Sequence, residues 1–244
     1  RRLAPLGRHL PAPAHGRPGG APKAEKPQER AGLAKMLSVA LRPAVAAVLA
    51  TKLAASVGAS MGQTVFPLVL KSFGVAEGGM VIAMSVVMIS NSVVGAVVIG
   101  PLVKRLTPRL LVPACLLAKA CCEACTALLA PGGTAAALLP ASVHSALPFA
   151  GFVILGSICQ FALATTLSVV STSAVGQDEQ GSLMGTEHAM FSGARIGTPA
   201  LATYLLGLGG AQLVSGACAS ISLCLLLAVQ AALLPQLAPG KKTR

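Results

Sequence analysis

The sequence predicts an all-α, polytopic membrane protein with a six-helix transmembrane bundle, and three observations lead to this fold class. Of the 244 residues, 54% are hydrophobic and only 11% are charged, whereas a soluble domain has about 25% charged residues. Six segments reach the roughly 20 apolar residues that a helix needs to cross a bilayer. Lys and Arg are concentrated in the segments between and outside them, on alternate sides.

The six apolar segments are expected to be helices, because no water in the bilayer core can bond an unpaired backbone amide. They run over residues 43–70, 79–103, 110–130, 147–170, 183–206 and 210–234. The last two are separated by a very tight turn around the letters LGLGG. The chain thus divides into a basic amino-terminal segment (1–42), a transmembrane domain (43–235) and a basic tail (236–244).

Residues 1–30 are rich in proline, glycine and arginine and have no apolar periodicity, which is typical of a disordered linker. A transit peptide is the alternative, but the stretch contains no serine and is broken by prolines. The chain begins with Arg1, so we expect a fragment or a processed product.

The positive-inside rule predicts that both termini are cytoplasmic. Nine Lys and Arg precede Pro43, three lie in the KRLTPR loop and three in the KKTR tail, whereas the opposite loops carry only Lys71. Which membrane holds the chain is not encoded in these counts.

Nucleic-acid binding is not expected, although the net charge is +12. The basic residues lie mainly before the apolar segments and do not alternate with aromatic residues. The partner expected from composition is the lipid bilayer.

No metal, cofactor or catalytic motif is predicted. Cys121, Cys122 and Cys125 lie inside an apolar run, where the first two point about 100° apart and no second ligand pair follows. The letters GASMG, at 58–62, spell G-x-S-x-G but fall within a predicted membrane helix, without the strand and turn that a nucleophile elbow requires. The sequence therefore predicts a protein that is not an enzyme.

Ionisable residues within membrane segments are functional candidates, since each is costly to bury. Lys52 is followed at helical spacing by Ser56, Ser60 and Gln63, which predicts a polar stripe lining a substrate path. The alternative for Lys52 is that its ammonium extends to the nearby interface.

The fifth segment has the second group of candidates. His188, Ser192 and Arg195 fall within an arc of roughly 60° on a helical wheel, with Glu187 to one side. Arg195 is predicted to hold an anionic substrate group or pair with a carboxylate elsewhere, or else to lock two helices together. Glu187 and His188 are candidates for proton coupling, with plain solvation near the helix start as the alternative.

Three further polar positions lie in the middle segments. Lys119 and Glu123 are four residues apart and are predicted to form a structural pair within their helix. Asn91 and Gln160 are predicted to bond either a substrate or a neighbouring helix.

The stretch GPLVKRLTPR resembles the second copy of the loop motif of the major facilitator superfamily, and Gly100, Arg105 and Arg109 match it. Lys104 stands where that motif has an acidic residue. A second stretch, from a polar loop with acidic residues into a helix with G-x-x-x-G-x-P at Gly193, Gly197 and Pro199, resembles the eleventh helix of the family. These three residues are predicted to serve helix packing.

The resemblance implies the carboxy-terminal half of a twelve-helix transporter that moves a small organic solute by alternating access. Within the superfamily the chain looks most similar to the organic cation transporter-like branch of solute carrier family 22 and to tetracycline-type exporters. The expected partner is a missing amino-terminal half or a second copy of the chain. Proton coupling stays open, and so does the alternative of a scaffold or degenerate transporter that moves nothing.

Overall fold

The computed structural model describes residues 36–132, 140 and 145–233, and this part of the chain is helical without a strand. Five of its helices are long and apolar enough to cross a membrane: Val45–Ser72, Glu77–Val103, Pro108–Leu129, Ala146–Ser173 and Gln180–Ala231. The all-helical class is confirmed, and so is the prediction of helices suited to a bilayer. Residues 36–40 form a helical turn inside the segment assigned to the linker, and the predicted tail at 236–244 lies outside the described residues.

Helix α2 spans Pro43–Ser72, and residues at both of its ends explain where it starts and stops. Pro43 occupies the first turn, where its missing N–H breaks no helical hydrogen bond. At the other end, Gly74 adopts φ +77°, and its N–H bonds the carbonyl of Lys71 while that of Val75 bonds the carbonyl of Leu70. This is a Schellman cap, which ends the helix and turns the chain into α3.

The second predicted segment forms three joined pieces: α3 (Glu77–Val93), a π-helical stretch η1 (Val94–Ile99) and α4 (Gly100–Arg105). Helix α4 extends the helical region two residues past the predicted segment end at 103, through Lys104 and Arg105 of the predicted KRLTPR loop. The turn itself is short, at Leu106 and Thr107, before α5 begins at Pro108. Pro101 lies in the first turn of α4, directly after η1, and a proline is tolerated in a first turn because its missing N–H breaks no hydrogen bond there.

Helices α5 (Pro108–Leu129) and α6 (Ala146–Ser173) begin within two residues of the predicted starts. Helix α5 packs against both α6 and α7 and is among the most buried spans. The exposed span is α3: 11% of its most apolar window is buried, against 44% for α5.

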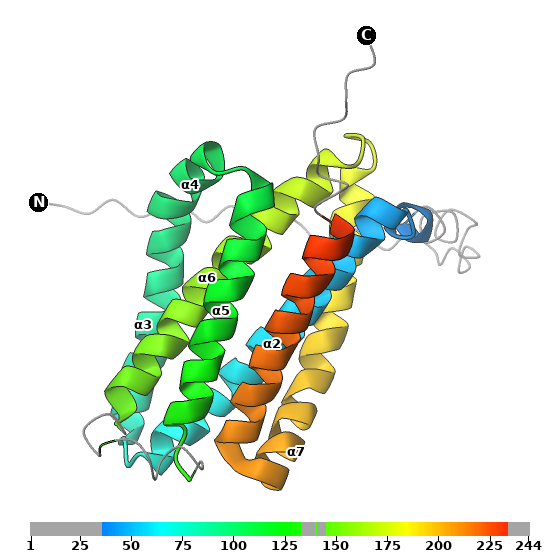
Figure 1. Ribbon diagram of the computed structural model, residues 1–244. Helices are drawn as coiled ribbons and strands as arrows, with labels where there is room; N and C mark the ends of the chain where they lie inside the picture. Colours follow the sequence, from blue (N-terminus) through cyan, green and yellow to red (C-terminus); the bar gives the residue numbers. More distant parts are fainter. Residues whose placement is uncertain (1–35, 133–139, 141–144, 234–244) are drawn as a thin grey trace, which may run out of the picture.

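Helix α7 (Gln180–Ala228) and the π-helical turn η3 (Val229–Leu233) that follows it together cover the last two predicted segments up to residue 233. Its backbone leaves the helical region at Gly209 and Gly210, where Gly210 has φ +65° and ψ −167°. Figure 1 shows the chain reversing direction there, so that the later part of α7 runs back beside the earlier part. We call residues 180–208 the first limb of α7 and residues 211–228 its second limb.

Gly210→Ala is expected to destabilise the protein by about 1–3 kcal/mol, because these backbone angles are accessible almost only to glycine. Gly207→Ala is the matched control, since Gly207 is helical and a methyl group there meets no atom. Thermal unfolding of the purified protein in detergent measures both. Equal melting temperatures for the two variants would mean that the reversal is not held by Gly210.

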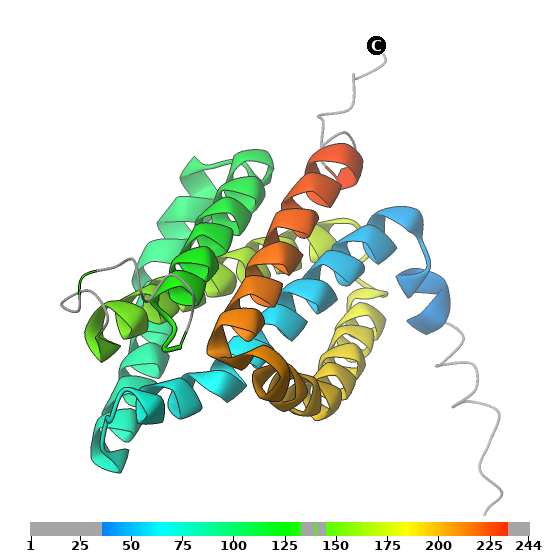
Figure 2. The same ribbon diagram turned by 60° about the horizontal axis from the view of Figure 1, so that its bottom comes forward.

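The two ends of the bundle differ in what they contain. Figure 1 places the start of α2, helix α4 and the turn from α6 into α7 at one end, with the α2–α3 turn and the reversal of α7 at the other. Figures 1 and 2 agree that α3 lies at one side of the bundle and the first limb of α7 at the other.

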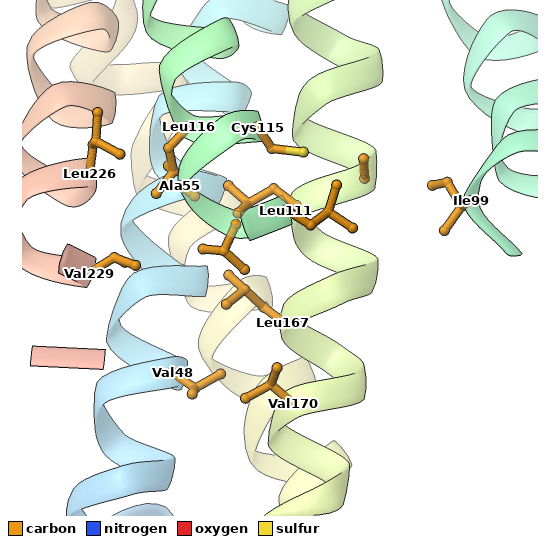
Figure 3. Close-up of a cluster of buried hydrophobic side chains, with 13 residues drawn as sticks. Val48, Ala55, Ile99, Leu111, Cys115, Leu116, Leu167, Val170, Leu226 and Val229 are labelled. Carbon is orange, nitrogen blue, oxygen red and sulfur yellow. The ribbon is translucent and has the colours of Figure 1, made fainter. Parts of the chain in front are cut away.

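Two large clusters of buried side chains hold the helices together. One joins α2, α5, α6 and the second limb of α7 near the α4 end, and Figure 3 shows it with Leu116, Leu167 and Leu226 among its members. The other lies toward the α7 reversal and includes Phe66, Phe149 and Val214. Polar groups that lie between these helices are therefore enclosed by apolar side chains.

Candidate functional site

A buried ion pair connects α2 with the first limb of α7. The Nζ atom of Lys52 donates to Oε2 of Glu187 at 2.6 Å and to the hydroxyl of Ser168 at 2.9 Å. The hydroxyl of Ser171 donates to the other carboxylate oxygen of Glu187 at 3.0 Å. Nζ also lies 5.9 Å from the ring centre of Phe191, within the range of a cation–π contact. Three helices thus meet on one charged network.

This pairing decides one alternative for each partner. Lys52 is only 4% exposed, so its ammonium does not extend to an interface, and its place on a substrate path stays a prediction. Glu187 is buried as well, which excludes plain solvation and leaves proton coupling a prediction. The structure shows the two residues neutralising each other.

An exposed ion pair lies at the same end of the bundle. The guanidinium of Arg42, just before α2, donates from both terminal nitrogens to the two carboxylate oxygens of Glu179, each at 2.6 Å. Glu179 immediately precedes α7. The hydrogen bonds to Glu179 and its negative charge raise the pKa of Arg42 above its ordinary value. This pair joins the start of α2 to the start of α7 at the surface.

A second buried network joins α5 to the second limb of α7. Lys119 and Glu123 form the predicted pair within α5, which is confirmed. Ser222 adds to it, since its hydroxyl donates to Glu123 at 2.6 Å and accepts from Lys119 at 3.2 Å. Nothing in the sequence signals Ser222, which is one of many small residues on an apolar helix.

The Lys119–Glu123 pair lies on the wall of a cavity inside the bundle. The cavity has a volume of about 100 Å³ and is partly open to the surroundings. Side chains of α2, α3, α5, α6 and the second limb of α7 line it, and most are apolar, with the three rings of Phe66, Phe149 and Phe152 among them. Small-molecule sites are commonly apolar hollows with a few polar groups, and this cavity has that composition.

The structure places two predicted path residues, Gln63 and Gln160, on the cavity wall. The Oε1 atom of Gln160 is buried and has no hydrogen-bond partner among the described residues. Asn91 does not line the cavity: its amide donates to Ser157 of α6 at 2.8 Å. Asn91 therefore bonds a neighbouring helix, one of its two predicted roles.

His188 and Arg195 lie away from the cavity, on the exposed side of the first limb of α7. Within the described residues, neither has a hydrogen bond or an ion pair. Lys52 is outside the cavity as well. None of the three predicted basic residues, Lys52, His188 and Arg195, therefore lines the cavity.

The residues of the two family-like stretches do not converge on the cavity. Gly100, Lys104 and Arg105 belong to α4, and Arg109 lies in the first turn of α5; the side chains of Arg105 and Arg109 are exposed.

No other helix packs closely against the two glycines of the second stretch. A methyl group added at Gly193 or Gly197 would meet no atom, and Pro199 is exposed too. The predicted packing role of these three residues is therefore not performed within the described part of the chain.

Among the described residues, the seven cysteines are free and no group of three or more His, Cys, Asp or Glu is positioned to hold a metal ion. Comparison of the chain with protein-family models, curated proteins and solved structures finds no match to any of them.

Proposed function

We propose that this chain is a six-crossing membrane domain of a secondary transporter, and that the cavity is where its small organic solute binds. The observation that carries the proposal is an apolar cavity, within helices suited to a bilayer, whose wall contains a neutralised Lys119–Glu123 pair and two glutamines. A helix bundle built only to fill the membrane has no use for such groups, since each is costly there.

Six crossings follow if each limb of α7 spans the bilayer. The first limb, at 1.5 Å per residue, is about 43 Å long, and the second limb with η3 about 34 Å, so each exceeds the roughly 30 Å hydrocarbon core. The basic KRLTPR stretch and the start of α2 lie at one end of the bundle, and Lys71 lies at the other. This supports a cytoplasmic location for the first of these ends, as the positive-inside rule favours.

The cavity wall indicates the class of solute. Three phenylalanine rings favour an apolar or aromatic body, and the unpartnered Oε1 of Gln160 favours a hydrogen-bond donor on it. Because Lys119 and Glu123 cancel each other's charge, the cavity requires no net charge on the solute. The major facilitator resemblance supports alternating access as the mode of movement.

Filling the cavity is the test. Gly62 lines it, and a Cβ atom added there meets no atom within 4 Å, so Gly62→Leu is expected to lower solute flux at least tenfold without unfolding the protein. The measurement is uptake of a panel of small aromatic amines, amides and alcohols into vesicles containing the full-length protein, with and without a pH gradient. Gly151→Leu is the control, because Gly151 is exposed on α6, outside the cavity.

Two outcomes would contradict the proposal. If Gly62→Leu transports as fast as the wild type, the cavity is not the solute site. If no solute of the panel moves in either direction, the alternative of a membrane scaffold gains support.

A further inference from the structure

The exposed side of the first limb of α7 carries a polar arc made of His188, Ser192 and Arg195. These residues span roughly 60° of the helix circumference at 100° per residue. Apolar side chains border the arc, and the most exposed is Ile196, at 82%. Within the described chain, no other helix covers this side of α7 at Arg195.

Arg195 lies at the middle of its limb. It is 15 residues after Gln180 and 14 before Gly209, which places it about 22 Å from either end. At the same level, Pro199 has no N–H, so it cannot bond the carbonyl of Arg195 four residues earlier. The carbonyl of Arg195 therefore lacks the backbone hydrogen bond that a helix normally supplies. Its guanidinium, at the same depth, has no partner among the described residues.

Lipid cannot satisfy these groups, and a long basic side chain reaches the interface only from near a helix end. Where lipid or another helix rather than water faces the arc, Arg195 therefore needs a partner with negative charge at the same depth. None of the seven acidic residues of this chain meets that requirement. Glu123 and Glu187 are in buried pairs, Asp178 and Glu179 precede the helix, Glu77 begins α3, and Glu25 and Glu29 precede the first apolar segment.

We propose that the His188/Ser192/Arg195 arc docks against an apolar membrane helix, outside these 244 residues, that carries an Asp or Glu at mid-bilayer depth. A second copy of the chain has no such carboxylate to offer, whereas a different helix can bond the guanidinium in the two-pronged geometry that Arg and carboxylates share. The proposal rests on α7 spanning a membrane and is independent of solute transport.

The test uses the whole chain in lipid nanodiscs and a synthetic single-span helix of leucine and alanine with one central Asp, labelled for energy transfer. The probe is expected to associate about tenfold more tightly than the same helix with Leu in place of Asp, as interhelical polar contacts in membranes allow. Arg195→Leu should remove this preference. It is expected to fold, because Arg195 contacts no partner in the described chain.

Matched controls distinguish a charge-dependent contact from nonspecific association of apolar helices. Arg109→Leu removes an exposed arginine from a helix end and should keep the preference, and a probe with Asn in place of Asp should lose most of it without any change to the protein. Equal binding of the Asp and Leu probes overturns the proposal, as does a preference that survives Arg195→Leu. Self-association that depends on Arg195 would identify a second copy of the chain as the occupant. Binding of benzoate that depends on Arg195, measured without the probe, would identify a small anion. Either outcome also overturns the proposal.

Discussion

Glu187→Ala is expected to destabilise the protein by about 3–5 kcal/mol, the cost of leaving one member of a buried ion pair without its partner. Lys52 is 4% exposed and would keep only the Ser168 hydroxyl as a hydrogen-bond partner. The apolar clusters around the start of α2 leave little room for water to replace the carboxylate. Chemical unfolding of the purified protein, followed by helical circular dichroism, measures the loss.

Two further variants show whether charge or shape carries the effect. Lys52→Met combined with Glu187→Leu removes both charges together and should recover most of the stability, because apolar replacements of a buried pair are often neutral or better. Arg42→Ala breaks the exposed pair with Glu179 and should leave unfolding nearly unchanged. If Glu187→Ala unfolds no more easily than Arg42→Ala, Lys52 is hydrated and the pair is not what holds α2 to α7.

The positions of the helices were largely predictable, since they follow from rules that act locally. Apolar length marks a membrane helix. The glycines at 209 and 210 mark the reversal of α7, because the angles of Gly210 are accessible almost only to glycine. The exception is at Lys104 and Arg105, which the sequence assigned to the KRLTPR loop but which form the end of α4.

The partners of the charged residues were not predictable in the same way. Lys52 and Glu187 are 135 positions apart, and their encounter depends on how α2, α6 and α7 cross. Spacing finds only pairs on one helix, which is why Lys119 and Glu123 were paired from the sequence while Ser222 was not. Arg195 was identified as a candidate by its depth in the segment, which is a local property. Which group would pair with its charge cannot be predicted from residues near it in the sequence.

The buried face of each helix was also hidden from the sequence. In water, a helix shows its core face as an apolar stripe opposite a polar one, but in a bilayer lipid tails are as apolar as leucine and both faces look alike. Leu147 and Leu163 on α6 illustrate this. The first is 82% exposed and the second 0% exposed, although both are leucines of one apolar segment.

Leu163→Ala is therefore expected to cost about 2 kcal/mol or slightly more, whereas Leu147→Ala should cost almost nothing. Buried Leu→Ala changes in soluble proteins cost about 2–5 kcal/mol, from lost transfer out of water and from the cavity left behind. In a membrane the unfolded helices stay among lipid, so the transfer part is small and the cavity part remains. Unfolding of the two variants in the same lipid–detergent mixture measures the difference. Equal stabilities would mean that lipid fills the space at Leu163, so that the cluster shown in Figure 3, of which Leu163 is a member, is not closely packed.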